Sequence, residues 1–286
     1  MFKRFVLINC PGLGAGDVRN SSGSNHSIEK LLRYSKDNDL VFDLSGIEQI
    51  GFDAFIKYQG ASPRKSCITA RLASRKVYGI DDFDAFTELG GGDDLHMPVF
   101  SVLSQPTSED ANDEVFVISI GNDESIVPAY EYIETGSDIE ALEKLIDVVS
   151  APLIRNELVV ANLSDFREAS MEGNPTLALA CLVNISKNCL EMYPHLGTND
   201  GFMFLSTTAI DPTVANSEFQ NELTPMMFHS PTCPIYDLGL RLLSDVGPTI
   251  AEFFGRKRNM FIGASMGKWM FAEQYPQEEP ISHIGS

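Results

Sequence analysis

The sequence predicts an α/β fold with a mixed or mostly parallel sheet flanked by helices, and three observations favour it. The chain has 286 residues, of which 43% are hydrophobic, so it is long enough and apolar enough for a substantial core. Short apolar segments of strand length alternate with segments whose apolar residues recur at helical spacing. The chain shows no internal repeat, and strands that alternate with helices are typical of α/β proteins.

The first elements are expected before residue 92. A strand is expected at residues 2–9, a helix from Ser27 to about Ser35, and further strands at 40–44 and 66–72. Three consecutive glycines at 90–92 mark the best candidate for a domain boundary. We therefore expect an N-terminal α/β subdomain at 1–92 and an acidic α/β domain at 93–286, with a single domain as the alternative.

Strands and helices are also expected to alternate after residue 92. Ser137 and Glu140 form a capping-box pattern before a helix at 138–150, and Asn174 with Pro175 begins a largely apolar helix that extends to 192. The remaining expectations are strands at 99–103, 115–120, 158–163, 202–205 and 259–262, helices at 211–223, 238–246 and 248–254, and an irregular loop at 224–234.

One catalytic signature lies near the end of the chain. Gly263, Ser265 and Gly267 have the spacing G-x-S-x-G after a short apolar segment. On this stretch of about fifteen residues the chain resembles the α/β-hydrolases, and the resemblance implies a nucleophile at Ser265. The family places an acid and then a histidine on later strands, whereas only residues 266–286, with His283, remain here. A serine hydrolase that uses Ser265 is therefore an alternative and not the first interpretation.

Signatures of cofactor and metal sites do not occur. Residues 10–16 are glycine-rich and follow the first strand, but Asp17 occupies the place of the third glycine of a dinucleotide fingerprint, and no G-K-[ST] sequence occurs. The chain contains no C-x-x-C or H-x-x-x-H spacing. We expect no cofactor, no metal and five buried thiols, at Cys10, Cys67, Cys181, Cys189 and Cys233.

Charge is distributed unevenly along the chain. The net charge is −19, yet residues 1–80 carry twelve basic and seven acidic residues, and residues 77–143 contain no Lys or Arg. Opposite patches on one subunit favour head-to-tail association into a ring or a filament. The predicted interface consists of a basic and an acidic group, namely Arg64, Lys65, Arg71, Arg75 and Lys76 with Asp81, Asp82 and Asp84.

The first interpretation is a non-enzymatic, self-assembling structural subunit, such as a phage tail or neck component of a virion whose acidic surface faces DNA. An acidic surface repels DNA, so we expect no direct high-affinity binding to nucleic acid, and we expect the partners to be further copies and other virion proteins. The alternatives are the Ser265 hydrolase and an acidic DNA-mimic inhibitor of a DNA-binding protein. The sequence has neither a membrane span nor a signal peptide, which predicts a cytoplasmic or virion protein that is not secreted.

Overall fold

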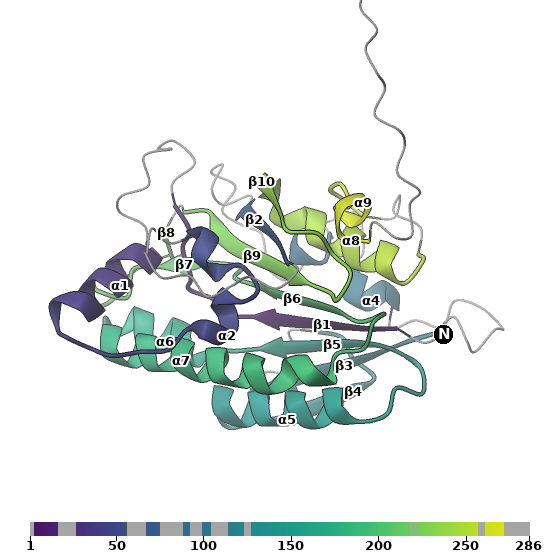
Figure 1. Cartoon of the computed structure of the whole chain (residues 1–286), viewed down its shortest axis with the longest axis horizontal. Coiled ribbons are helices and arrows are strands. Elements are labelled where there is room, and N and C mark those ends of the chain that lie inside the picture. Colours follow the sequence, from purple (N-terminus) through teal and green to yellow (C-terminus); the bar gives the residue numbers. More distant parts are fainter. Residues whose placement is uncertain are drawn as a thin grey trace, which may run out of the picture.

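The computed structural model describes residues 3–16, 27–55, 67–74, 88–91, 99–103, 114–122, 127–217, 219–220, 222–256 and 261–271. Its centre is an eight-stranded sheet with the strand order β10-β2-β9-β6-β1-β5-β3-β4 (Figure 1). Every pairing in this sheet is parallel except the two made by β9, so seven strands run in one direction and β9 runs in the other. The α/β class with a mixed, mostly parallel sheet is therefore confirmed.

The strands are short and lie far apart in the sequence. Their bounds are Arg4–Asn9 for β1, Cys67–Ala73 for β2, Val115–Gly121 for β3, Glu131–Glu134 for β4, Asn156–Asn162 for β5, Gly201–Leu205 for β6, Thr224–His229 for β9 and Tyr236–Leu242 for β10. A separate two-stranded sheet joins β7, Ala209–Ile210, to β8, Phe219–Gln220. The main sheet includes strands from both sides of residue 92.

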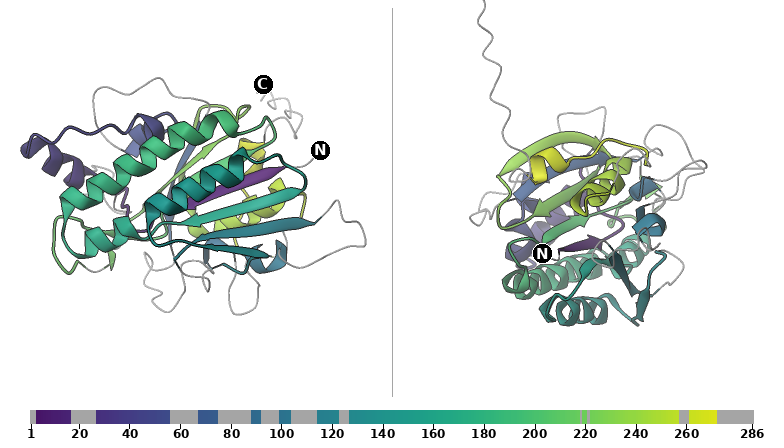
Figure 2. Two further views of the ribbon diagram at one scale, coloured as in Figure 1. Left: turned by 90° about the horizontal axis from the view of Figure 1, so that it is seen from below. Right: turned by 90° about the vertical axis from the view of Figure 1, so that its right-hand side faces the viewer.

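The sheet is covered on both faces, which explains why its central strands are apolar throughout (Figure 2). In β1, Val6 and Ile8 point to one face and Phe5 and Leu7 to the other. The first face packs against α1 (Ser27–Asp37), α2 (Ser45–Glu48), α5 (Asp138–Ser150), α6 (Asp165–Met171) and α7 (Pro175–Met192). The second face packs against α4 (Val99–Leu103), α8 (Val246–Phe253) and α9 (Gly267–Met270).

Elements with strong local signals are confirmed. The expected helix at 138–150 is α5, and the hydroxyl oxygen of Ser137 accepts the N–H of Glu140 at 3.3 Å. The amide oxygen of Asn174 likewise accepts the N–H of Leu177, at 3.1 Å, at the start of α7. The helices expected from Ser27 and at 248–254 are present, and so are the strands expected at 2–9, 66–72, 115–120, 158–163 and 202–205, within a few residues. All five cysteines are buried thiols.

Five local expectations are wrong, and for the segments that form β9 and β10 the reason is pairing with a distant strand, which overrides local patterns. Residues 40–44 form no strand, and 99–103 form the helix α4. The stretch at 211–223 contains β8 instead of a helix, and 224–234 begins with β9, a fully buried strand that pairs with both β2 and β6. The expected helix at 238–246 is mostly β10, whose leucines follow the two-residue period of a strand beside β2.

No helix within the described ranges combines sufficient length with sufficient hydropathy to cross a membrane.

Candidate functional site

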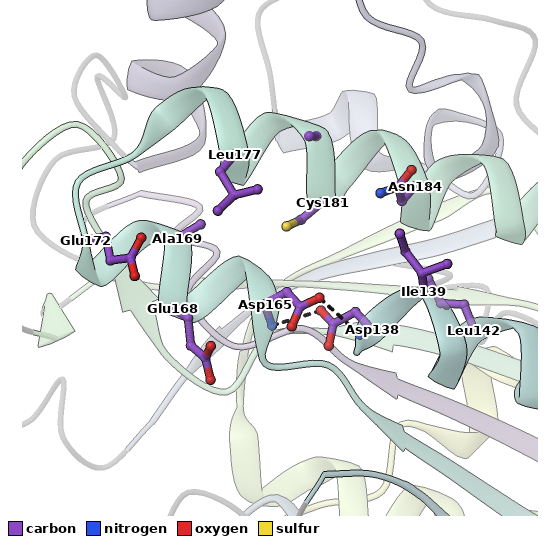
Figure 3. Close-up of a pocket in the computed structure, with 11 residues that line it drawn as sticks. Asp138, Ile139, Leu142, Asp165, Glu168, Ala169, Glu172, Leu177, Cys181 and Asn184 are labelled. Carbon is purple, nitrogen blue, oxygen red and sulfur yellow. Dashed lines mark hydrogen bonds between the residues drawn. The ribbon is translucent and has the colours of Figure 1, made fainter. Parts of the chain in front are cut away.

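A cavity of about 240 Å³ lies where the N-termini of α5 and α6 meet the side of α7 (Figure 3). Asp138 begins α5, shortly after β4, and Asp165 begins α6, three residues after the end of β5. Both aspartates therefore lie at the carboxyl edge of the parallel strands, where open α/β sheets bind ligands. The cavity is lined by Asp138, Ile139, Leu142, Asp165, Glu168, Ala169, Glu172, Leu177, Ala180, Cys181 and Asn184.

Asp138 and Asp165 hold each other in place through backbone N–H groups. The carboxylate of Asp138 accepts the N–H of Ser164 at 2.8 Å and that of Asp165 at 3.0 Å. The carboxylate of Asp165 accepts the N–H of Asp138 at 3.0 Å. The two helices thus satisfy N–H groups of each other's first turn, which have no partner within their own helix. Three hydrogen bonds therefore join the starts of the two helices.

The surroundings of Asp138 change its ionisation. The residue is only 6% exposed, and burial, together with the nearby charge of Asp165, raises the pKa of Asp138 from 3.8 to about 7. Its two bonds from backbone N–H groups act in the opposite direction but do not cancel this effect. Asp138 therefore exchanges a proton close to neutral pH, as a general acid or base must.

The other lining residues define what the cavity can accept. Glu168 and Glu172 are exposed, while Ile139, Leu142 and Leu177 contribute apolar surface. Burial raises the pKa of Cys181 to about 12, so its side chain is a neutral thiol and not a nucleophilic thiolate. Four carboxyl groups beside one cavity favour a neutral or positively charged group and disfavour a dianion.

Amide side chains form further hydrogen bonds at the carboxyl ends of the strands, beside the cavity. The amide N–H of Asn9, at the end of β1, donates to the amide oxygen of Asn162, at the end of β5, at 2.8 Å. The amide N–H of Asn122 donates to the hydroxyl of Ser164 at 2.9 Å. Asn9 is fully buried, and no hydrogen bond to its own amide oxygen is found within the described residues. These groups connect β1, β3 and β5 at the edge that carries the cavity.

Within the described ranges, no three side chains of His, Cys, Asp or Glu converge as a ligand set for a metal ion. Asp138 and Asp165 are two carboxylates that the fold brings together in this cavity. Sequence analysis did not single out either residue, although a signal was present. Asp138 is the first residue of the helix expected at 138–150, and Asp165 follows the strand expected at 158–163, and such positions form the carboxyl edge of a parallel sheet.

Ser265 lies two residues before α9, a helix that packs on the opposite face of the sheet (Figure 1). Its hydroxyl donates to the carboxylate of Glu252 and accepts the N–H of Gly267 at 2.9 Å, so it caps the first turn of a four-residue helix. The preceding residues 261–263 form no strand, and 257–260 lie outside the described residues. The strand that a nucleophile elbow requires is therefore absent from the described part of this segment.

The described histidines lie away from this serine. The ring of His229 packs against Tyr193, with ring centroids 5.7 Å apart, and Tyr193 belongs to the core on the other face of the sheet. His195 follows α7 on that same side. His26, His96 and His283 lie outside the described residues.

We predict that a fluorophosphonate probe leaves Ser265 unlabelled, because its hydroxyl is engaged as a cap and its partner is a carboxylate on α8. Intact-mass spectrometry of the wild type and of Ser265→Ala after incubation with the probe measures this. One equivalent of label on the wild type that disappears in the variant would establish a reactive serine and contradict the prediction.

The predicted assembly interface can be compared with the structure at one residue. Arg71 lies in β2, and its guanidinium donates to the carbonyl oxygens of Ala15 at 3.3 Å and Ala54 at 3.4 Å. It also lies 5.4 Å from the centre of the Phe55 ring. These contacts hold Arg71 within its own chain. The other interface residues lie outside the described part of the chain, and they are Arg64, Lys65, Arg75, Lys76, Asp81, Asp82 and Asp84.

Comparison with known proteins was informative only at the level of structure. No family model matches the sequence, and no curated protein matches it. The fold is similar to that of the murine ectonucleotide pyrophosphatase/phosphodiesterase 5, an inactive variant in complex with AMP, with 7% identity and a TM-score of 0.57 over 94% of this chain and 100% of that chain.

Two further structures show the same likeness. One is i-CgsB in complex with k-i-k-neocarrahexaose, with 12% identity and a TM-score of 0.52 over 93% of this chain and 75% of that chain. The other is the lipoteichoic acid synthase LtaP from Listeria monocytogenes, with 9% identity and a TM-score of 0.51 over the same shares. At these identities the likeness shows a shared fold.

The interpretation as a self-assembling structural subunit of a phage tail or neck is therefore wrong. It was based on charges counted along the sequence, and such counts describe solubility and association without specifying a fold. The α/β sheet and its helices are shared over most of their length with proteins named as enzymes. The chain is similar in fold to a phosphodiesterase and a lipoteichoic acid synthase.

Proposed function

We propose that this chain is a hydrolase that cleaves an ester at the carboxyl edge of its sheet, with Asp138 as the group that transfers the proton. A fold by itself does not specify an activity, so the proposal depends on a feature of this chain. That feature is a buried carboxyl group whose pKa is about 7, located in a cavity at the edge where α/β sheets bind ligands.

The first substrate class to consider is a phosphodiester. The murine structure of similar fold is named a pyrophosphatase/phosphodiesterase and holds AMP. The carboxylates of this cavity disfavour any anion, but they oppose the single negative charge of a diester less than the two charges of a monoester. The apolar side chains of Ile139, Leu142 and Leu177 offer a surface for the organic part of such a substrate.

Asp138 has two roles available near neutral pH. In its neutral form it donates a proton to the leaving oxygen as the ester bond breaks, and in its ionised form it accepts a proton from the attacking water. Asp165 is a positioning residue, because it accepts the backbone N–H of Asp138 and its charge contributes to the raised pKa of that carboxyl.

Hydrolysis of bis(p-nitrophenyl) phosphate by the purified chain, followed from acid to alkaline pH, tests the proposal. We expect turnover whose rate changes around pH 7, the pKa of Asp138. Asp165→Asn keeps an oxygen that can accept the N–H of Asp138 but removes the negative charge. Because that charge helps to raise the pKa of Asp138, we expect the variant's profile to shift to lower pH.

The matched control is Glu191→Gln, which removes an exposed carboxylate from the distant end of α7 and is expected to leave the profile unchanged. The esters p-nitrophenyl phosphate and p-nitrophenyl sulfate extend the assay to other ester classes. Absence of turnover of every ester by the folded protein would overturn the proposal. A profile that is the same in Asp165→Asn and the wild type would remove Asp138 from the mechanism.

A further inference from the structure

The acidic side chains of the cavity have no basic partner within the described residues. Four carboxyl groups line the cavity, and none of the ion pairs formed among the described residues involves them. Asp165, Glu168 and Glu172 follow one another at spacings of three and four residues, which places their like charges on one side of α6. Arg167, the only basic residue of α6, is one or two positions from Asp165 and Glu168, and residues at such spacings do not face each other.

The helix N-termini at the cavity do not reverse this charge. Each N-terminus carries roughly half a positive charge. Asp138 and Asp165 already accept N–H groups there and offset it. Glu168 and Glu172 add negative charge in excess of that balance. The cavity therefore favours a cation.

Polar side chains of α7 face the same cavity. Cys181 is 7% exposed, and Figure 3 shows its sulfur directed from α7 towards α6. Within the described residues, neither the Cys181 thiol nor the side-chain amide of Asn184 forms a hydrogen bond with another residue. Buried polar groups are ordinarily satisfied, and both the sulfur and the amide oxygen can accept a hydrogen bond. A ligand that carries N–H donors would satisfy them.

The lining also indicates which kind of cation fits. None of the residues that line the cavity is aromatic, whereas quaternary ammonium groups are recognised by aromatic faces. A primary ammonium group has three N–H donors, which match carboxylate, amide and thiol acceptors. Ile139 and Leu177 are exposed apolar side chains of the lining, and they can contact the hydrocarbon chain that carries the ammonium group.

We propose that the cavity binds a primary ammonium group, carried by the organic part of the ester that this chain hydrolyses. The link to a substrate rests on the proposed hydrolase activity, whereas the binding site itself does not. The volume of about 240 Å³ is below the roughly 300–1,000 Å³ of pockets for drug-sized ligands, so the cavity holds one group of a larger molecule. An ammonium group also offsets the single negative charge of a phosphodiester, so the substrate enters this acidic cavity without net charge.

Isothermal titration calorimetry of the full chain with n-butylammonium at low ionic strength tests the site. At about pH 8 the amine remains protonated and Asp138, with its pKa of about 7, is largely ionised. We expect butylammonium to bind about tenfold or more tightly than n-butanol, which has the same hydrocarbon chain without the charge. It should also bind more tightly than tetramethylammonium, which has the charge without N–H donors.

Variants of the exposed carboxylates locate the binding. Glu168→Gln and Glu172→Gln keep the size of the side chain and remove its charge, and each is expected to weaken binding of butylammonium by a few-fold, the usual effect of one exposed charge. Glu191→Gln, at the distant end of α7, is the matched control and is expected to bind as the wild type does. Circular dichroism of the three variants establishes that they are folded.

Two matched diesters connect the site to catalysis, namely 4-aminobutyl p-nitrophenyl phosphate and butyl p-nitrophenyl phosphate. We expect a higher kcat/KM for the amino ester, and we expect Glu168→Gln and Glu172→Gln to reduce this preference. Equal kcat/KM values for the two esters, or butylammonium that binds no better than butanol, would overturn the inference and leave the hydrolase proposal standing. Tight binding of butylammonium without turnover of either ester would overturn the hydrolase proposal alone and establish the ammonium site.

Discussion

Replacement of Glu157 by Ala is expected to lower the free energy of unfolding by about 3–5 kcal/mol, the cost of breaking a buried ion pair by removing one partner. Arg4 in β1 and Glu157 in β5 form a pair at 2.9 Å, and their side chains are only 2% and 8% exposed. Arg4 also donates to the carbonyl oxygens of Val149 and Ala151 at the end of α5. The variant leaves the guanidinium charge buried in this environment without the carboxylate that faces it.

Urea unfolding followed by circular dichroism and tryptophan fluorescence measures the change. The control is Glu191→Ala, which breaks the pair between Lys187 and Glu191 on the exposed side of α7. An exposed pair of this spacing contributes about 0.3–0.5 kcal/mol, so the control should unfold close to the wild type. Equal effects of the two substitutions would contradict the role of the Arg4–Glu157 pair.

Replacement of Asp138 by Asn is expected to lower kcat for bis(p-nitrophenyl) phosphate by about 100-fold to 10,000-fold, the usual contribution of a positioned general acid or base. Asn is similar in size and cannot transfer a proton near neutral pH. It retains one oxygen for the two N–H groups that Asp138 accepts, so the fold around the cavity is expected to persist. Steady-state kinetics of the variant, with Glu191→Gln as the control, measure the effect.

The stability of the same variant provides a second measurement. The pKa of Asp138 is higher in the folded chain than its ordinary value of 3.8, so the fold favours the neutral carboxyl group. Its contribution to stability is fully present below the ordinary pKa and is lost as the pH rises through about 7. The wild type should therefore lose stability relative to Asp138→Asn over this range. A kcat equal to that of the wild type would refute the catalytic role, and parallel stability profiles would refute the raised pKa.

The parts of the fold that local sequence predicts are those whose signals lie within one segment. The cap at Ser137 and the helix start at Asn174 and Pro175 are confirmed because each requires only neighbouring residues. The apolar strands β1, β3 and β5 are confirmed because their burial on both faces makes them apolar throughout. β9 and β10 were missed because their strand conformation depends on pairing with β2, which is more than 150 residues earlier in the chain.

The candidate site shows the same division. The sequence contains Asp138 and Asp165 at the starts of two helices, and one of these helices was predicted correctly. The local sequence does not show that the N-termini of α5 and α6 lie side by side. These helices follow β4 and β5, and the position of those strands on either side of β3 is decided by the pairing of the whole sheet. The raised pKa of Asp138 arises only from that meeting and from burial. The G-x-S-x-G pattern, by contrast, is visible in the sequence, but the structure engages Ser265 as a cap on the other face of the sheet.

The sequence by itself determined that the chain forms an α/β protein, because apolar periodicity and capping residues are local and each element carries its own signal. Only the tertiary structure decided the strand order, the edge position of β10 and the cavity beside Asp138, because these depend on which distant segments pack together. Charge along the chain suggested an assembly, and most of the residues on which that prediction rests lie outside the described part of the chain. Function at this site depends on neighbours in space, and the fold creates those neighbours.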